Sequence, residues 1–561
     1  MRRTRRAAWR PASCADPGNR VLQRLGRVSP AFATMAVSLW LVVFCNASFW
    51  RALWRIEGGL DWSSLGFLAA VFVFAVLLFD FLLTLLAFPW VSKPLLMLVL
   101  AVSAVTAYFM DAYGVMIDYV MLQNILQTDV PEVAELLSWR MAGYALLLGG
   151  VPALWLAWTQ IAYPRWQKQL LNKALVLTAI VLGLGAIAFL CYKDFVSVIR
   201  NHGEVRYLLT PANYLGAANG FLRARARAPR TLQMLGEDAR KGPGWPASAK
   251  ATLTVLVLGE TARAANFSLN GYARKTNPQL EKEDIVYFSN VLSCGTSTAS
   301  SLPCMFSDLG REGFDADSAA HRQGLLDVFA HAGLTVLWRD NNTGCKGICD
   351  RVAGEDLTRQ QPSVFCRADE CYDEILLQGL QERLDRTQRD LVVVLHQKGS
   401  HGPAYHLRVP EAFKVFGPVC GSNQLEKCSR EEIVNAYDNT IVYTDHVLAK
   451  TVALLRRNAG RFDAALLYVS DHGESLGENG GIYLHGLPYA VAPIEQRHVP
   501  MLVWLSEGFR ARFRIDQACL EAKRHAAFSH DGLFHSMLGL LDIQTRAYRP
   551  ERDLFAGCRR G

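Results

Sequence analysis

Residues 464–473 read Ala-Ala-Leu-Leu-Tyr-Val-Ser-Asp-His-Gly, a short apolar run that stops at polar side chains. Two other stretches have the same form: residues 252–260 end in a glutamate, and residues 391–396 end in a histidine. Short, continuous apolar runs are typical of buried parallel strands. Helix-like patterns at residues 318–332 and 372–386 alternate with such runs. This alternation predicts an α/β domain with a mostly parallel sheet.

The polar residues at these strand ends are of the types that bind zinc. Ligands of open α/β sheets gather at the carboxyl ends of strands, so we expect Glu260, Asp471 and His472 to converge. Two carboxylates and an imidazole, completed by a hydroxyl or water, leave the open position that a catalytic zinc needs. Taken singly, each residue is more often a cap, a salt-bridge partner or part of a surface turn. Together they favour a metal site.

A hydroxyl-rich segment, residues 293–301, reads Ser-Cys-Gly-Thr-Ser-Thr-Ala-Ser-Ser. Alone, such a segment usually forms a turn or a helix cap. At the start of a helix its backbone N–H groups would also suit a phosphate. A threonine or serine hydroxyl beside a metal ion becomes nucleophilic at neutral pH. The segment is therefore the candidate source of a nucleophile.

The first third of the chain is strongly apolar. Each of its five apolar stretches has about 20 residues, the length that crosses a bilayer core. They cover residues 30–50, 64–88, 93–115, 141–163 and 171–193. We therefore expect a transmembrane bundle of five helices at residues 30–193. Residues 194–246 would be a linker, with a basic amphipathic helix on the membrane surface or a solvated tether.

Charge predicts the orientation of these spans. The first 27 residues hold eight arginines and a single acid, Asp16. Such a start can bind nucleic acid, but the apolar span that follows at once favours a cytoplasmic anchor at residues 1–29. The positive-inside rule then places residues 247–561 in the periplasm after five spans. We expect an inner-membrane protein with no nucleic-acid partner.

Cysteine usage supports an oxidising compartment. Ten of the 13 cysteines follow residue 195, most of them in closely spaced pairs. The pair Cys345 and Cys349 could also be half of a metal site, but no second pair has matching spacing. Pairing of neighbours predicts four disulfides: Cys294 with Cys304, Cys345 with Cys349, Cys366 with Cys371, and Cys420 with Cys428. Cys519 and Cys558 remain as candidates for a fifth, long-range pair.

Long runs of this sequence resemble the lipid A phosphoethanolamine transferases, which include the mobile colistin-resistance enzymes. The similarity extends over essentially the whole chain, and its soluble part resembles the alkaline phosphatase and sulfatase superfamily. The runs that carry the resemblance are Gly259 to Tyr272, Ser293 to Thr298, Pro303 to Ser307, Gly344 to Arg351, Gly399 to Pro403 and Ser470 to Asn479.

The resemblance implies a role for each matching residue. Thr298 matches the nucleophile that carries phosphoethanolamine as a phosphothreonine, and it joins Glu260, Asp471 and His472 at a catalytic zinc, with a second zinc possible. His401 and His485 match a second group near the site. The residues expected to line the substrate pocket are His396, Lys346 and Asn342, and those expected at the phospholipid head group are Asn124, Thr128 and Glu132.

The sequence departs from the family pattern at two places. Gly480 and Gly481 stand where the family usually has one glycine, which moves His485 one residue away from His472. Gln127 stands where a glutamate is expected, so the ethanolamine ammonium could instead meet Asp129.

The expected reaction transfers phosphoethanolamine from phosphatidylethanolamine to a lipid A phosphate and releases diacylglycerol. One of His396, His401 and His485 would be the general acid, and Lys346 would offer charge to the phosphate. Loss of lipid A charge would confer resistance to polymyxin. The alternatives are a core Kdo or heptose sugar or a glucan as acceptor, a phosphodiesterase of the same superfamily, and a non-enzymatic scaffold. We expect a monomer.

Overall fold

The computed structural model describes residues 26–57, 62–128, 130–227, 231–246, 250–358, 363–367 and 370–560. Most of the predicted cytoplasmic arginine-rich start and the alternative ligand Asp129 lie outside these ranges. The chain forms two compact units: residues 1–107 with 142–201, and residues 108–141 with 202–561. These compact units do not test the predicted domain boundaries, which stay a prediction.

The first unit consists of apolar helices. Four are long and apolar enough to cross a membrane: Ser64–Leu85, Ser92–Tyr113, Trp139–Trp158 and Trp166–Leu190. Helix α3 (Trp62–Leu85) packs against both α1 (Pro30–Phe44) and α9 (Trp166–Leu190). The other helices are α2 (Ala47–Glu57), α4 (Ser92–Tyr113), α7 (Trp139–Tyr144), α8 (Val151–Trp158) and α10 (Tyr192–Asn201), and a π-helical turn, Ala145–Gly150, joins α7 to α8.

The first predicted span is not one straight helix. Helices α1 and α2 meet at an angle of 60°. At the break, the Leu41 carbonyl accepts both the backbone N–H of Cys45 at 3.0 Å and the side-chain amide of Asn46 at 2.8 Å, which caps the end of α1. The described residues therefore hold four candidate spans, or five if the bent pair counts as one.

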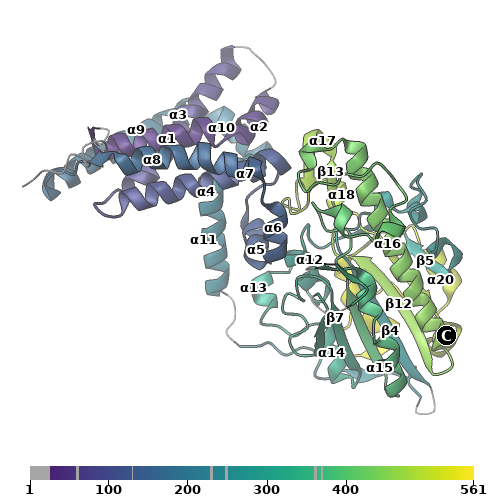
Figure 1. The fold of residues 1–561 in the computed structure, drawn as a ribbon. Coiled ribbons are helices and arrows are strands. Elements are labelled where there is room, and N and C mark those ends of the chain that lie inside the picture. Colours follow the sequence, from purple (N-terminus) through teal and green to yellow (C-terminus); the bar gives the residue numbers. More distant parts are fainter. Residues whose placement is uncertain are drawn as a thin grey trace, which may run out of the picture. The chain divides into compact units, whose positions relative to one another are not determined.

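A seven-stranded sheet forms the centre of the second unit, with the order β5-β15-β12-β4-β11-β7-β8 (Figure 1). The five strands from β12 to β8 are parallel, and β15 is antiparallel to both of its neighbours, as expected for a mostly parallel sheet. Their bounds are β4 (Ala251–Gly259), β5 (Ile285–Phe288), β7 (Thr335–Asp340), β8 (Ala353–Asp356), β11 (Leu391–His396), β12 (Phe462–Ser470) and β15 (Met501–Leu505).

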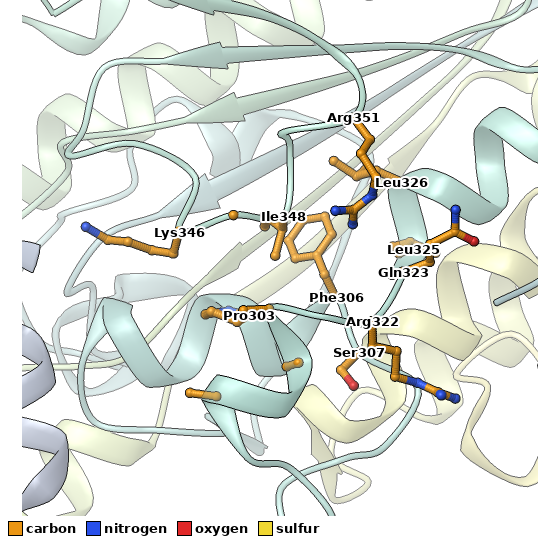
Figure 2. A pocket seen from close by; sticks show the side chains of 15 residues that line it. Pro303, Phe306, Ser307, Arg322, Gln323, Leu325, Leu326, Lys346, Ile348 and Arg351 are labelled. Carbon is orange, nitrogen blue, oxygen red and sulfur yellow. The ribbon is translucent and has the colours of Figure 1, made fainter. Parts of the chain in front are cut away.

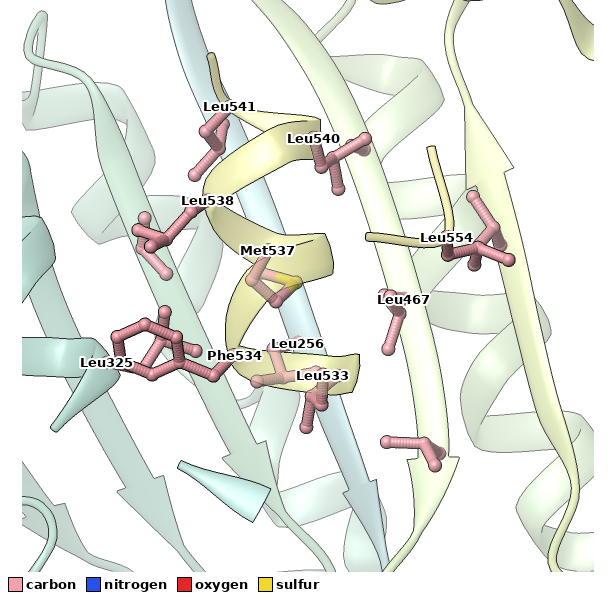
Figure 3. Close-up of a cluster of buried hydrophobic side chains, with 14 of the residues drawn as sticks. Leu256, Leu325, Leu467, Leu533, Phe534, Met537, Leu538, Leu540, Leu541 and Leu554 are labelled. Atoms are coloured by element: carbon pink, nitrogen blue, oxygen red, sulfur yellow. The ribbon is translucent and has the colours of Figure 1, made fainter. Parts of the chain in front are cut away.

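Helices cover both faces of this sheet. Alternate residues of β4 and β12 enter two separate cores, because successive side chains of a strand point to opposite faces. On one face, Leu256 and Leu467 lie against Leu533, Phe534 and Met537 of α21 (Leu533–Leu540; Figure 3). The other core is covered by α16 (Arg430–Arg457) and α15 (Leu380–Arg386).

The predicted helices at 318–332 and 372–386 are each broken. The first divides into α13 (Ala316–Ala319) and α14 (Leu325–His331), and Gly324 is the N-cap of α14. The second divides into a 3₁₀ turn, Asp373–Leu377, and α15, where Gly379 adopts a left-handed φ of 71°. Gly379 adopts the left-handed conformation that costs glycine least, whereas Gly324 has an ordinary extended backbone and marks only the start of α14.

The segments of the second unit that adjoin the first unit along the chain form shorter helices. They are α5 (Tyr119–Gln127), α6 (Val130–Leu136), the 3₁₀ helix Gly203–Leu208 and α11 (Ala212–Arg227). Helix α5 packs against α11 and against α12 (Thr298–Met305). Helix α11 lies within the predicted linker at residues 194–246, and the amphipathic helix on the membrane surface stays a prediction. The smaller C-terminal helices are α19 (Glu507–Phe513) and α20 (Gln517–Ala522).

Candidate active site

The predicted metal ligands lie together at the carboxyl end of the sheet. Glu260 follows β4, and Asp471 and His472 follow the neighbouring parallel strand β12. One ligand atom from each of the three lies within 4.8 Å of the others, and all three side chains are buried. His472 Nε2 is 3.3 Å from Glu260 Oε1 and 3.4 Å from Asp471 Oδ2. The convergence predicted from three strand ends is present for these residues.

Thr298 completes this group. It is the first residue of α12, and its hydroxyl donates to Glu260 Oε2 at 2.9 Å and lies 3.3 Å from His472 Nε2. A disulfide between Cys294 and Cys304 ties the loop before Thr298 to the end of the same helix. Thr298 therefore occupies a helix start, where backbone N–H groups can receive a phosphate.

The close packing around Glu260 depends on a glycine. Gly399 has a φ of 55°, and a Cβ at this position would lie 2.6 Å from the carbonyl oxygen of Glu260. The backbone N–H of Ser400 donates to that same oxygen at 2.9 Å. The loop after β11 can approach Glu260 only because residue 399 has no side chain.

Charge at the group favours a cation. Burial, and then the Glu260 carboxylate, raise the pKa of Asp471 to about 6. Burial lowers the pKa of His472, but the charge of Asp471 and the contact with Glu260 outweigh it and raise the value to about 9. Glu260 Oε1 and Asp471 Oδ2 are both enclosed and accept no hydrogen bond. Two enclosed carboxylate oxygens without a hydrogen bond, each within 3.4 Å of the His472 imidazole, fit a divalent metal ion.

The three predicted histidines lie around this group. The His485 ring is 4.4 Å from the His472 ring and 5.5 Å from the His401 ring, centroid to centroid. The additional glycine before His485 is accommodated by a left-handed turn at Gly481, where φ is 94°. Burial lowers the pKa of His401 to about 3, so this imidazole is neutral at pH 7.

His396 differs from His401 because it forms an ion pair with a carboxylate, that of Asp340. Its Nδ1 lies 3.0 Å from Asp340 Oδ2, and Asp340 also accepts from the indole of Trp338 at 2.6 Å. Burial lowers the pKa of His396, but the Asp340 charge and hydrogen bond outweigh burial and raise it. Asn342 links His396 to the metal-ligand group: its amide nitrogen is 3.3 Å from His396 Nε2 and donates to Glu260 Oε2 at 2.8 Å.

Of the residues expected at the phospholipid head group, Glu132 reaches the site. Its Oε1 accepts from Lys398 Nζ at 3.0 Å and lies 3.6 Å from His401 Nε2. The structure gives Asn124 and Thr128 a contact within their own segment, because the Thr128 hydroxyl donates to the Asn124 carbonyl at 2.9 Å. Gln127, at the end of α5, has an enclosed side-chain oxygen that finds no hydrogen-bond partner among the described residues.

Lys346 is directed into its own loop. Its ammonium donates to the carbonyl and to the hydroxyl of Thr343 at 3.0 and 2.8 Å. Figure 2 shows its side chain pointing away from Phe306 and Leu325, which line a cavity of about 30 Å³ beyond α12. This cavity has room for only one or two waters, so it is a packing void and not a lipid site.

Three charged residues that the sequence analysis missed contact the site residues. Asp340 holds His396, Glu474 holds His485 Nδ1 at 3.2 Å, and Arg408 donates to the His401 carbonyl at 2.9 Å. Asp340 was open to prediction, because it ends the apolar strand β7 as Glu260 follows β4. Glu474 lies within the run Ser470 to Asn479 that carries the resemblance but was given no role, and Arg408 lies outside all of these runs.

The four predicted cysteine pairs and the long-range candidate pair are joined as disulfides. Cys345 and Cys349 are thus bonded to each other, and the disulfide is favoured over the alternative that they form half of a metal site.

The chain is similar in sequence to characterised families. Residues 252–543 match the sulfatase family, and residues 73–226 match the phosphoethanolamine transferase EptA/EptB family. EptA of Escherichia coli K12 is 43% identical over 87% of this chain and 89% of its own length. Phosphatidylethanolamine transferase Mcr-1 of Escherichia coli is 37% identical over 92% of this chain and 95% of its own length.

A solved structure matches the fold. The integral membrane lipooligosaccharide phosphoethanolamine transferase A of Neisseria meningitidis superposes with a TM-score of 0.92 and 38% identity. The match covers 96% of this chain and all of the other. A more distant relative, the Kdo(2)-lipid A phosphoethanolamine 7''-transferase of Escherichia coli K12, is 27% identical over 79% of this chain and 81% of its own length.

Proposed function

The chain belongs to the EptA family of phosphoethanolamine transferases, and on that premise we propose that it moves phosphoethanolamine from phosphatidylethanolamine to a lipid A phosphate. The observation that carries the proposal is the Thr298 hydroxyl, held at a helix start within 2.9 Å of Glu260 and 3.3 Å of His472. A hydrolase could use the same group, but the family relation favours transfer.

We propose Thr298 as the nucleophile. Its oxygen attacks the phosphorus of the donor and loses its proton, which Glu260 Oε2 is placed to accept. The bond between phosphorus and the glyceride oxygen breaks, diacylglycerol leaves, and Thr298 carries phosphoethanolamine. The acceptor phosphate then attacks the phosphothreonine and frees the threonine. Helix α12 presents its N-terminal N–H groups to the phosphate in both steps.

Glu260, Asp471 and His472, with Thr298, would hold a zinc ion, and a second zinc near His401 and His485 remains part of the proposal. When bound, zinc would lower the pKa of the threonine hydroxyl and offset charge on the phosphate. Of the three candidate histidines, His396 suits the general acid best, because Asp340 favours its protonated form.

Glu132 and Lys398 are proposed to pair with the two charged groups of the donor head group. The Glu132 carboxylate suits an ammonium, while the Lys398 ammonium suits a phosphate. Asn124 and Thr128, on the same membrane-proximal segment, are proposed to line the donor's path, and Lys346 and Asn342 the phosphate pocket. Gln127 is uncharged, so it cannot form the ion pair with the ethanolamine ammonium that a glutamate would form.

We further propose the topology predicted from charge: five spans, with α1 and α2 as one bent span, a cytoplasmic N-terminus and a periplasmic catalytic unit in the bacterial inner membrane. The five disulfides agree with an oxidising compartment. The chain would act as a monomer. Added phosphoethanolamine lowers the negative charge of lipid A, so resistance to polymyxin would follow.

Mass spectrometry of lipid A from a Gram-negative host tests the proposal. Cells that express the native chain should show a phosphoethanolamine adduct, and cells that express Thr298→Ala at the same level should not. An adduct on core sugars in place of lipid A would favour a core sugar as the acceptor. We keep this alternative because the chain is also related to the Kdo(2)-lipid A phosphoethanolamine 7''-transferase. Diacylglycerol release without any adduct would instead point to a phosphodiesterase.

A further inference from the structure

Two arginine side chains flank a tyrosine next to the nucleophile segment. The guanidinium carbon of Arg311 lies over the Tyr489 ring at 4.5 Å from its centroid, and that of Arg497 at 5.2 Å. The two guanidinium groups are therefore no farther apart than the sum of these distances. Contact with an aromatic ring fixes their positions but leaves their positive charge uncompensated.

Neither guanidinium forms an ion pair with a carboxylate in the part of the chain that the structure describes. The Nε of Arg497 is enclosed and has no hydrogen-bond partner. An enclosed charged donor without a partner is unusual in a folded protein, since it has lost water without gaining another acceptor. Arg497 Nε therefore has no acceptor among the described residues, whereas Arg311 is exposed and its charge is open to a ligand.

One carboxylate lies near, but it is used elsewhere. Asp531 Oδ1 accepts from the backbone N–H of Arg311 at 2.9 Å. The neighbouring Glu312 is exposed to solvent. Among the described residues, neither of these acids forms an ion pair with Arg311 or Arg497.

Hydrogen bonds attach this pair to the segment that carries Thr298. The Tyr489 hydroxyl donates to the Ser293 carbonyl at 3.0 Å, and the Thr296 hydroxyl donates to the Leu487 carbonyl at 2.6 Å. The backbone N–H of Gly486 donates to the Thr296 carbonyl at 2.7 Å. These bonds connect residues 486–489, which include Tyr489, to residues 293–296, which lead directly to Thr298.

We propose that Arg311 and Arg497 bind a second phosphate monoester of the glycolipid acceptor, while its other phosphate reacts at Thr298. This inference rests on the proposed function. Guanidinium groups match phosphate oxygens with paired N–H donors, which makes arginine well suited to this ligand. The phospholipid donor carries one phosphate, which Thr298 itself engages, so a second phosphate site next to the nucleophile fits the acceptor and not the donor.

Kinetics with matched acceptors test this site. The full chain, in nanodiscs that contain phosphatidylethanolamine, is given lipid A with two phosphates or lipid A that retains only the phosphate that is modified. We expect the wild type to show a lower KM for the form with two phosphates. In the double variant Arg311→Gln, Arg497→Gln that preference should fall by roughly 10-fold, as the loss of charge-assisted hydrogen bonds implies.

The control variant is Arg546→Gln, whose side chain is 91% exposed and pairs with Asp238 at the surface. It should keep the preference. A double variant that keeps the preference overturns the site, even if its rate is low with both acceptors. Diacylglycerol release by the wild type is measured in the same samples: if it is absent, the proposed function fails, whereas release with an unchanged preference in the double variant refutes the phosphate site alone.

Discussion

At the scale of single residues, the site is a set of charges that need partners. Glu260, Asp471 and His472 leave two enclosed oxygens unpaired, while His396 and His485 each have a carboxylate. A histidine held at Nδ1 by a carboxylate has a fixed ring orientation, and its Nε2 is directed to the other side. Asp340 is therefore a positioning residue, because it acts through His396.

Asp340→Asn should lower kcat by about 100-fold while KM for the donor changes little, because an amide neither fixes the same tautomer nor supports the protonated imidazole. The measurement is steady-state transfer by the purified full chain. Asp385→Asn is the matched control, since Asp385 pairs with Arg461 on an exposed surface. An equal loss in kcat for both variants, or a change confined to KM, would show that Asp340 does not act through His396.

At the scale of elements, a single buried arginine joins two segments that border the site. Arg408 donates to Glu135 of α6 at 2.6 and 2.9 Å, contacts Glu370, and donates from Nε to the carbonyl of His401 at 2.9 Å. Its side chain is 2% exposed. Since α6 also carries Glu132, the guanidinium holds the donor-side helix and the His401 loop in one arrangement.

Arg408→Gln should destabilise the protein by about 3 kcal/mol, because it removes the buried counter-charge of Glu135 and of the partly exposed Glu370. Thermal unfolding of the full chain in detergent measures the loss, and Arg408→Lys should restore part of it. The comparison variant is Lys414→Gln, which breaks an ion pair to the largely exposed Glu411 and should cost no more than about 1 kcal/mol. Similar thermal unfolding midpoints for Arg408→Gln and Lys414→Gln would show that Arg408 does not hold α6 and the His401 loop together.

At the scale of the whole molecule, what could be predicted depended on local pattern. Parallel strands bring their carboxyl ends to one edge, so Glu260 and Asp471 could be placed together from sequence. The bridge from Arg408 to Glu135 joins residues 273 positions apart and has no periodic signal. The bend of 60° between α1 and α2 was missed because the hydropathy of residues 30–50 is continuous across it.

Disulfides act at this scale too, because they restrict the unfolded chain. The bond from Cys519 to Cys558 closes a separation of 39 residues, whereas that from Cys345 to Cys349 closes 4. Loop-closure entropy assigns the longer loop about 4 kcal/mol and the shorter about 2 kcal/mol. Removing the long-range bond with paired serine substitutions should therefore lower the thermal midpoint of the full chain more than removing the short one does. Equal losses, or a larger loss for the Cys345 and Cys349 pair, would mean that local order around Lys346 matters more to stability than the constraint on the C-terminal 40 or so residues.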